Sequence, residues 1–585
     1  MIDFETARKE AFDGISETNT IIKTQKKIKG KYGYTRSEEI WEVIVEIPVN
    51  DKIRDFKLLF ELKPDFPLSI PEISLSEEDY ETIKYIPHVD DKRNICLFDQ
   101  ENIKIDSYRP KYIAKACIER AKEIIINGLQ KTNLIDFNDE IVAYWNNTYN
   151  VNESGVAGGY LGDGVSELLP GKLIAYNLSP SYDKTNIFFG SDNDESKKIL
   201  DFFRMHGHNL KKQQAFYLGI ISKIEPPFFF TNSSILSFID NNFATYSREI
   251  KSYLNESLDS KILIFSLKVN EELVFFGFNI IGFKNTQNGW RKGSLNTVKI
   301  MSSIQGNATI QRISFKYFSF KRIRKRTDGI SSPSFPLKIM VSGLGSIGSN
   351  LLFYLSCLEI SDLLLVDPDI LQLENINRHL LSFNEVGENK VDAIAKYMIF
   401  NNPFLNIEKY SLSVVDVIEK NLSSINNMDI LFCAIGKDSI ENYIIQCLAS
   451  NKIERPVIFL WVEPYMIGAH ALYINPNTNF RLTDLEVENY YKFNIISELD
   501  YKNPDNNLLL KEAGCQSSYI PYGKESIARF FAAFLPDLFN LIKNKPVDNF
   551  AFTYFGDFDI ALSRDLEIST FAKSHAPGQL IKQII

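Results

Sequence analysis

A glycine-rich stretch of this chain has the spacing that nucleotide-binding turns use. Gly343, Gly345 and Gly348 form the pattern G-x-G-x-x-G directly after an apolar run and before a helical pattern. Glycines at this spacing permit a tight turn, and they let backbone N–H groups approach an anionic ligand at the N-terminus of a helix. Asp367 and Asp369 follow the next apolar run, where an acidic side chain accepts hydrogen bonds from ribose hydroxyls. The two features together predict a nucleotide site.

Polar and cationic side chains beyond this turn separate two classes of nucleotide enzyme. Asn375, Arg378 and Lys390 follow Asp369 along the chain. A hydride-transfer enzyme binds the pyrophosphate of its dinucleotide with backbone groups, whereas an enzyme that attacks a phosphate needs fixed positive charge where negative charge develops. Arg378 and Lys390 therefore favour chemistry at phosphate over an NAD-dependent oxidoreductase, which stays an alternative.

One of the six cysteines stands in surroundings that suit a reactive thiol. Cys515 lies in a loop-like stretch of Gly, Gln and Ser. A thiolate is a strong nucleophile near neutral pH and a natural acceptor for an activated acyl group. The apolar neighbours of Cys357, Cys433 and Cys447 predict that these three are packed in the core.

The elements that hold the nucleotide site are predicted to form a doubly wound parallel sheet. Short apolar runs alternate with helical patterns, which is the arrangement of βαβ units. The runs cover residues 338–342, 362–366, 429–433 and 456–461, and the helical patterns cover 349–358 and 391–400. We therefore expect a Rossmann-like α/β domain in the C-terminal part of the chain.

The rest of the chain predicts two further domains. Period-2 alternation predicts antiparallel strands over 41–47 and 57–62, followed by a helix over 112–126. A stretch rich in Asn, Gly and Ser over 146–162 reads as a boundary without regular structure. The predicted division is an N-terminal α+β domain over 1–150, a middle α+β domain of unknown role over 151–320, and the α/β domain over 321–585. His206 and His208 lack carboxylate or thiol neighbours, so no metal site is predicted there.

Length, charge and cysteine spacing limit the class of protein. A chain of 585 residues predicts about three domains. The net charge of −9 gives no overall positive field, so we expect no direct nucleic-acid partner. The N-terminal residues carry no signal pattern, no apolar stretch is long enough to span a membrane, and no C-x-x-C pair is present. These features predict a cytoplasmic protein with free thiols.

The nucleotide motifs resemble the adenylation domain of the ubiquitin-activating, ThiF and MoeB-like family, from about residue 330 onward. The resemblance implies that Asp369 binds the ribose of ATP and that Asn375, Arg378 and Lys390 contact its phosphates. It further implies Asp438 as the Mg²⁺ ligand, although this chain has Gly-Lys-Asp-Ser where the family has Asp-Asn. Relatives also bring an arginine from ahead of the first strand, often across a dimer interface. That position falls on the basic run that holds Arg322, Arg324 and Arg326, of which we expect Arg326.

The first 150 residues resemble the ubiquitin-conjugating fold. The matching segments are Phe66-Pro67 with Pro71, the loop from His88 to Cys96, and Tyr108-Arg-Pro110. The resemblance implies that Cys96 is the carrier thiol. The family's His-Pro-Asn triplet is replaced by His88-Val-Asp90, and an ionised carboxylate cannot donate a hydrogen bond to an oxyanion. Asn94 is the expected substitute donor, and His88 is expected to be structural.

A conjugating-like and an activating-like domain on one chain resemble the fused, CD-NTase-associated enzymes of bacterial CBASS anti-phage operons. The resemblance implies a homodimer that uses ATP and Mg²⁺ to adenylate the C-terminal carboxylate of a partner protein, either a CD-NTase or a ubiquitin-like protein. It implies capture of the acyl group on Cys515, transfer to Cys96 and conjugation to a lysine amine. A MoeB-like sulfur-transfer enzyme and a nucleotide-binding scaffold without conjugation are the remaining alternatives.

Overall fold

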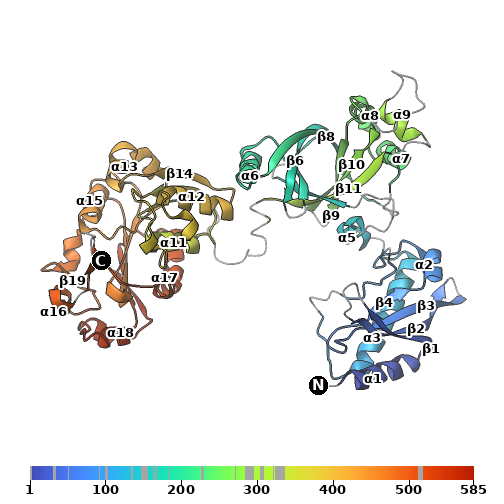
Figure 1. Ribbon diagram of the computed structural model, residues 1–585, viewed down its shortest axis with the longest axis horizontal. Helices are drawn as coiled ribbons and strands as arrows, with labels where there is room; N and C mark the ends of the chain where they lie inside the picture. Colours follow the sequence, from blue (N-terminus) through green and yellow to red (C-terminus); the bar gives the residue numbers. More distant parts are fainter. Residues whose placement is uncertain are drawn as a thin grey trace. The chain divides into compact units, whose positions relative to one another are not determined.

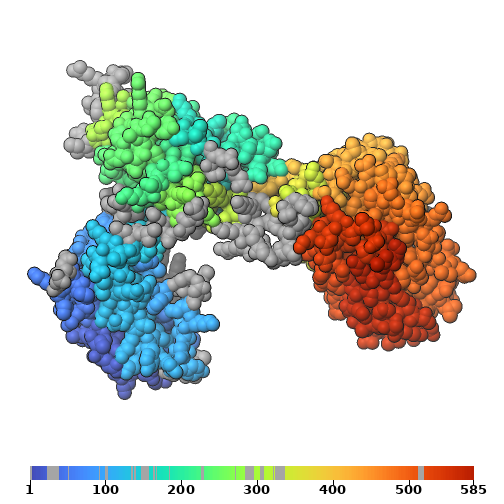
Figure 2. Space-filling model, turned by 180° about the vertical axis from the view of Figure 1, so that it is seen from behind, coloured from blue at the N-terminus to red at the C-terminus, as the bar shows by residue number. Residues whose placement is uncertain are grey.

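The chain folds into two compact units, residues 1–322 and 323–585. Figure 1 shows the computed structural model as a ribbon, and Figure 2 shows one face of its surface. The described residues are 3–29, 35–49, 52–90, 92–98, 103–133, 136–146, 156–162, 165, 168–182, 185–224, 230–269, 272–283, 296–303, 308–319, 322, 336–506, 508–511 and 518–585.

The first unit begins with a four-stranded antiparallel sheet in the order β1-β2-β3-β4. Its strands are β1 (Thr20–Lys29), β2 (Thr35–Val49), β3 (Lys52–Leu62) and β4 (Glu72–Leu75). Helices α1 (Phe4–Ser16) and α3 (Pro110–Gln130) pack on each other and share one core with the sheet, and α2 (Glu77–Ile83) follows β4. Burial alternates along the second half of β3, as the period-2 pattern predicts. The predicted strands and the predicted helix are confirmed.

The first unit continues into a closed barrel in the strand order β10-β11-β5-β7-β6-β8-β9 (Figure 1). Two short helices, α4 (Asp136–Asp139) and α5 (Ile141–Asn146), precede it. The strands are β5 (Val156–Leu161), β6 (Gly171–Tyr182), β7 (Thr185–Phe189), β8 (Asn209–Ile221), β9 (Lys261–Val269), β10 (Glu272–Ile281) and β11 (Thr309–Tyr317). Helices α6 (Asp194–Met205), α7 (Asn232–Asn242), α8 (Ser247–Asn255) and α9 (Thr297–Ser302) lie between them in sequence. Aliphatic and aromatic side chains form a core cluster across all seven strands.

The expectation that residues 146–162 lack regular structure is wrong for 156–161, which form β5. β5 pairs in parallel with both β7 and β11. A glycine is required at position 159 in this strand, because a Cβ there would lie 2.4 Å from the ring of Phe315 on β11. The small residues that suggested a linker therefore permit close packing within the barrel. The three-domain division of the chain stays a prediction.

The second unit is built on an eight-stranded sheet in the order β14-β13-β12-β15-β16-β17-β22-β23. Its first five strands are parallel: β12 (Leu337–Ser342), β13 (Ile360–Val366), β14 (Asn406–Tyr410), β15 (Ile430–Cys433) and β16 (Val457–Val462). The remaining three are antiparallel: β17 (Gly468–Ile474), β22 (Phe550–Phe555) and β23 (Leu580–Ile584). The predicted strands are confirmed, and the antiparallel extension was not predicted.

Helices cover both faces of this sheet. One core holds residues of α11 (Ser346–Leu355), α12 (Lys390–Asn401) and α17 (Lys524–Asn544). A second core holds residues of α13 (Val414–Lys420) and α15 (Asp438–Ala449). The predicted doubly wound α/β class is therefore confirmed. Within the part of the chain that is described, no helix has the length and apolar composition that a bilayer crossing requires.

The prediction that three cysteines are packed in the core is wrong for one of them. Cys433 and Cys447 are buried, but Cys357 is exposed. Cys357 lies just beyond the end of α11, where its thiol donates to the carbonyl oxygen of Tyr354 at 3.0 Å. The apolar pattern of α11 therefore does not extend to this residue.

Candidate functional site

The glycine turn connects β12 to α11, and each glycine has a different physical role. Gly343 has φ +83°, and a Cβ there would lie 2.6 Å from the carbonyl oxygen of Ala434. A Cβ on Gly348 would lie 1.9 Å from the carbonyl oxygen of Gly343, so the turn and the helix can approach only without side chains. Gly345 has no neighbour within 4 Å of its Cβ position. The backbone at Gly345 is therefore open to a ligand at the N-terminus of α11.

The two aspartates that follow β13 have separate roles. Asp367 is buried, and its carboxylate accepts from the backbone N–H of Leu344 at 2.6 Å and of Asp369 at 2.8 Å. Burial raises the pKa of Asp367, and the nearby Lys390 cation opposes that rise. Asp369 is largely exposed, and it accepts from Lys390 Nζ at 2.9 Å. Asp367 therefore stabilises the turn, whereas Asp369 faces solvent, where a ribose can reach it.

Arg378 connects the glycine turn to the segment that follows residue 517. Its guanidinium donates to the carbonyl oxygen of Ile520 at 2.9 Å and lies 5.3 Å from the centre of the Tyr522 ring. The hydroxyl of Tyr522 in turn forms a hydrogen bond with Ser346 in the first turn of α11. The amide of Asn350 donates to the carbonyl oxygen of Arg378 at 2.9 Å, which fixes its backbone.

These elements enclose a cavity of about 480 Å³ at the carboxyl edge of the parallel strands. This volume lies in the usual range for small-molecule sites, about 300–1,000 Å³. Five of the residues singled out from the sequence line it: Gly345, Asn375, Arg378, Lys390 and Asp438. Residues from distant parts of the unit complete the wall, among them Glu441, Trp461, Tyr491, Asn494 and Tyr522.

One end of the cavity is acidic. Asp438, Glu441 and Glu486 line it together. Glu441 is 4% exposed, and burial, followed by the charge of Asp438, raises its pKa to about 7. Among the described atoms, its Oε1 has no hydrogen-bond partner. The described residues hold no group of three or more metal-ligating side chains, so a cation here would take carboxylate and phosphate oxygens together.

An aromatic wall closes another part of the cavity. Trp461 stacks on the buried imidazole of His470 with ring centres 5.1 Å apart. His470 Nε2 lies 2.9 Å from the buried carboxylate of Glu463, which also accepts from the backbone N–H of Ile495 at 2.7 Å and of Ile496 at 3.0 Å. Hydrogen bonding to both oxygens satisfies the buried carboxylate and fixes the wall. Trp461, Glu463 and His470 were not predicted, because no local motif marks them.

Several predicted site residues lie outside the described residues. Cys515, Arg324 and Arg326 belong to this group, so their roles stay predictions. Arg322 is described, and its backbone N–H donates to Ser319 Oγ at 3.2 Å. Its role toward ATP stays a prediction.

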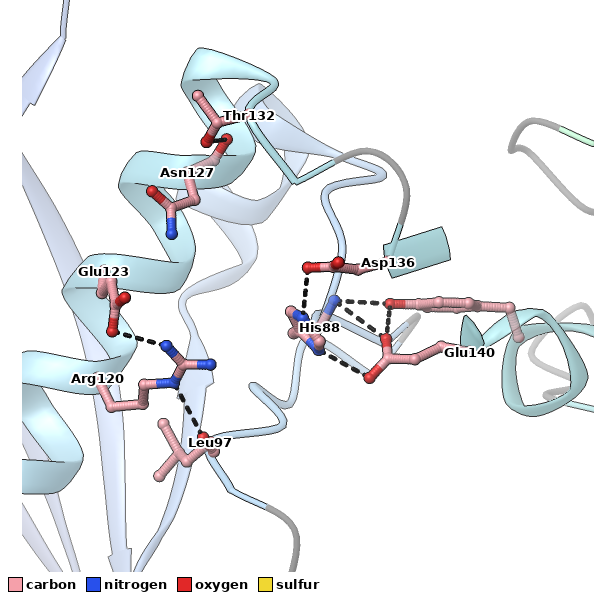
Figure 3. A network of polar contacts seen from close by, with 9 residues as sticks. His88, Leu97, Arg120, Glu123, Asn127, Thr132, Asp136 and Glu140 are labelled. Carbon is pink, nitrogen blue, oxygen red and sulfur yellow. Dashed lines mark hydrogen bonds and ion pairs between the residues drawn. The ribbon is translucent and has the colours of Figure 1, made fainter. Parts of the chain in front are cut away.

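The second candidate site surrounds Cys96 in the first unit. Cys96 is exposed, and its backbone N–H donates to the carbonyl oxygen of His88 at 2.7 Å. On the other side, Arg120 of α3 donates from Nε to the carbonyl oxygen of Leu97 at 3.2 Å (Figure 3). Residues 88–97, named here the Cys96 loop, are thus bound through the backbone on both sides of the thiol.

His88 is the centre of a polar network beside this loop (Figure 3). Its Nδ1 lies 2.7 Å from Glu140 Oε1, and its Nε2 lies 3.0 Å from Asp136 Oδ2. The hydrogen bond that His88 donates to Glu140 is the main cause that raises the pKa of His88, against the effect of burial. The His88 backbone N–H also donates to Tyr144 Oη at 2.8 Å. Two carboxylates facing one ring favour the imidazolium form.

Asn94, the predicted donor to an oxyanion, is bound to Asp90. Its backbone N–H donates to Asp90 Oδ1 at 2.7 Å, and its side-chain amide donates to Asp90 Oδ2 at 3.0 Å. In this arrangement Asp90 shapes the loop rather than contacting an acyl group. The role of Asn94 as an oxyanion donor stays a prediction.

Two family models match the chain, one mostly before the barrel in the sequence and one after it. The model of the prokaryotic E2 family B matches residues 24–153, and the model of the ThiF family matches residues 335–469. One chain thus carries a region similar to the prokaryotic E2 family B and a region similar to the ThiF family. The first match includes the Cys96 loop, and the second includes the part of the nucleotide cavity that is formed by residues up to 462.

The chain is also similar to curated proteins and to solved structures. The ATP-dependent ubiquitin transferase-like protein Cap2 of Pseudomonas aeruginosa is 21% identical over 477 residues, which is 79% of this chain and 80% of that protein. Ubiquitin-like modifier-activating enzyme 5 of Drosophila virilis is 34% identical over 90 residues, 15% of this chain and 22% of that enzyme. E. coli MccB with AMPCPP and MccA matches at 15% identity and a TM-score of 0.28, covering 42% of this chain and 63% of MccB.

Proposed function

We propose that this enzyme uses ATP to activate the C-terminal carboxylate of a partner protein and conjugates it, through Cys515 and then Cys96, to a lysine amine. The observation that carries the proposal is the cavity in which Gly345, Asn375, Arg378 and Lys390 meet at a helix N-terminus. A separate, exposed thiol within an E2-like domain supplies the second half of the reaction.

Adenylation follows from the charges that line the cavity. A carboxylate oxygen of the partner attacks the α-phosphate of ATP, the bond from that phosphorus to the bridging oxygen breaks, and pyrophosphate leaves. Negative charge builds up on the phosphate oxygens in the transition state. Arg378 and Lys390 stabilise this charge, and the open backbone at Gly345 donates to the phosphates. Asp369 accepts from the ribose, while Asp367 keeps the turn in shape.

The acidic end of the cavity fits Mg²⁺. The orphaned Glu441 Oε1 and the adjacent Asp438 provide carboxylate oxygens beside the position of the phosphates. Mg²⁺ is commonly held by one or two carboxylates plus substrate phosphates. Asp438 would hold the ion there, and the ion would offset charge on the departing pyrophosphate.

Two thiols then carry the acyl group. The Cys515 thiolate attacks the acyl adenylate and AMP leaves, so the acyl group becomes a thioester. The Cys96 thiolate attacks that thioester and the Cys515 thiolate leaves. A neutral lysine amine finally attacks the Cys96 thioester, the thiolate departs and the amine loses its proton. Each step exchanges one acyl bond for another, so no oxidant or reductant is needed.

The partner is a protein or peptide with a free C-terminus. By its resemblance to the fused CBASS enzymes, we propose a CD-NTase or a ubiquitin-like protein as that partner and a cytoplasmic homodimer as the working form. The chain covers less than two thirds of the length of modifier-activating enzyme 5 and of MccB.

A non-reducing gel tests the order of transfer. The enzyme is incubated with ATP, Mg²⁺ and a candidate partner, and adducts that a reductant removes are compared among variants. We expect Cys515→Ala to abolish both thioesters and Cys96→Ala to leave only the one on Cys515. Conjugation to lysine at the normal rate in the Cys96→Ala enzyme would exclude the carrier role and favour a sulfur-transfer enzyme of MoeB type. Absence of ATP–pyrophosphate exchange with every partner would favour a scaffold.

A further inference from the structure

The short helices α4 and α5 contact both the Cys96 loop and the barrel. Asp136 and Glu140 contact the imidazole of His88, and Tyr144 contacts its backbone N–H. The residue after Tyr144 is Trp145, which is fully buried in a core cluster of the barrel and its helices. Two consecutive residues of α5 therefore contact different parts of the unit, Tyr144 the Cys96 loop and Trp145 the barrel.

Trp145 is held in the barrel by contacts of several kinds. Its indole N–H donates to the carbonyl oxygen of Ile313 on β11 at 2.9 Å. Its ring centre lies 5.0 Å from that of Phe276 and 5.6 Å from that of Phe265, on β10 and β9. The guanidinium carbon of Arg312 lies 5.8 Å from its centre. A fully buried tryptophan with a satisfied N–H is a rigid anchor.

The donors around His88 are all engaged within the network. Both imidazole nitrogens face carboxylates, and the Tyr144 hydroxyl accepts from His88 N–H and donates to Glu140 Oε2 at 2.9 Å. The charge of a Cys96 thiolate nevertheless contributes to raising the pKa of Tyr144, after burial and Glu140. The thiol is thus within electrostatic reach of α5, although the donors of the network point inward. Such an arrangement positions a loop rather than stabilising an oxyanion.

We propose that residues 136–146 form a strut by which the barrel positions the Cys96 thiol, with Trp145 as its anchor and Tyr144 and Glu140 as its positioning residues. The strut gives the barrel a role in conjugation, namely control of the geometry from which Cys96 transfers its acyl group. This part of the inference depends on the proposed function, whereas the mechanical connection does not.

Hydrogen exchange in the full chain tests the mechanical connection directly. Mass spectrometry follows amide exchange in peptides that cover residues 86–98 of the wild type and of Trp145→Ala, Trp145→Phe and Tyr144→Phe variants. We expect exchange there to quicken about fivefold in Tyr144→Phe, the ratio that corresponds to the loss of one hydrogen bond. Trp145→Ala is expected to have at least as large an effect, because it removes the contacts that hold α5 in the barrel, and Trp145→Phe a smaller one.

A barrel variant away from the strut is the matched control. Phe275 is buried in the barrel, and its ring contacts Tyr217 and Tyr317. Phe275→Ala removes a similar aromatic side chain, and we expect exchange over residues 86–98 to stay at the wild-type rate. Equal acceleration in Phe275→Ala and Trp145→Ala, or none in Trp145→Phe and Tyr144→Phe, would overturn the strut.

Single-turnover discharge separates the strut from the proposed function. We expect Tyr144→Phe to charge Cys96 to the wild-type level and to discharge it to free lysine about fivefold more slowly. Altered exchange without any thioester on Cys96 would refute the proposed function and leave the strut intact. Normal charging and discharge together with unaltered exchange would refute the strut alone.

Discussion

The guanidinium of Arg378 lies over the ring of Tyr522, 5.3 Å from its centre, and donates to the backbone of Ile520. A residue expected to contact phosphate thus also binds the segment that follows Cys515 in the sequence. In the proposed function, this one side chain connects the departure of pyrophosphate with the approach of the thiol, because Arg378 cannot move without changing its contacts with Ile520 and Tyr522.

Substitution of Arg378 by lysine is expected to impair both roles. Lysine keeps the charge but loses the planar donor set that stacks on Tyr522 and contacts Ile520. We expect ATP–pyrophosphate exchange to fall about 10- to 100-fold, the size of a lost charge-assisted hydrogen bond. Limited proteolysis near residues 518–522 is expected to quicken. Arg529→Lys, at an exposed ion pair with Glu525, is the control, and equal exchange rates for the two variants would contradict this role.

Removal of the Lys390 cation is expected to destabilise the second unit most at alkaline pH. Lys390 is 7% exposed and lies near the buried Asp367, whose pKa is already raised by burial. Without the cation, folding favours the protonated form of Asp367 still more, so stability decreases as pH rises above the ordinary aspartate range. We expect Lys390→Met to lose about 3 kcal/mol at pH 8 and less at pH 5, measured by urea unfolding. The exposed Lys396→Met should show no such dependence.

Glutamine at position 441 is expected to stabilise the protein at alkaline pH. The raised Glu441 pKa means that the folded state holds a proton that the unfolded state has released. The stability of the wild type therefore falls as pH rises from about 4.5 to about 7. Glu441→Gln removes this fall, with a gain of up to about 3 kcal/mol at pH 8 and little gain below pH 4. Unfolding at several pH values measures this gain in stability, with a Glu→Gln substitution at the exposed Glu454 as the control. Equal dependence of stability on pH in the wild type and in Glu441→Gln would refute the raised pKa.

Glutamine at position 140 is expected to lower the pKa of His88. The hydrogen bond that His88 donates to Glu140 is the main cause of the raised pKa, with Asp136 as a further one. The charged network stabilises the fold fully below the ordinary histidine pKa, and this contribution is lost as pH rises through the folded pKa. NMR titration of the histidine resonances measures the shift, with His88→Gln for assignment. Glu123→Gln, which alters only the contact with Arg120, should leave the His88 titration unchanged.

Alkylation by iodoacetamide is expected to distinguish the described cysteines. Cys96 and Cys357 are exposed, whereas burial raises the pKa of Cys117 to about 12 and that of Cys433 as well. The thiolate is the reacting form, so Cys96 and Cys357 should be labelled first at pH 7.5. Peptide mass spectrometry measures the order, and labelling of all four in urea is the control. Early labelling of Cys117 would contradict the buried core of the E2-like domain.

The parts of the fold that local patterns specify were predictable from the sequence. The strand before Gly343 and the helix after it follow from apolar periodicity and a glycine turn, and both are present. The strands β17, β22 and β23 were missed, although Pro464, Pro546 and Pro577-Gly578 mark turns ahead of them, because their apolar runs alone do not separate strand from helix. β5 was missed because its glycines look like a linker when their barrel neighbours are unknown.

Residues that meet only through the tertiary fold could not be predicted. Ser346 and Tyr522 are 176 positions apart in the sequence, yet they form a hydrogen bond. Trp461 and Glu441 reach the nucleotide cavity from separate elements without a motif. A single sequence records spacing along the chain, whereas these contacts depend on the path of the sheet through space.

The bond between Trp145 and Ile313 joins residues 168 positions apart, and this separation has a consequence for biosynthesis. Domains generally fold from the N-terminus during synthesis, so the four-stranded sheet can form while the ribosome is still translating the barrel. The indole N–H of Trp145 lacks its acceptor, the carbonyl oxygen of Ile313, until β11 has emerged and paired with β5. The nascent chain therefore makes Cys96 early, but in our proposal it completes the contacts that position this thiol only after more than half of the polypeptide has been made.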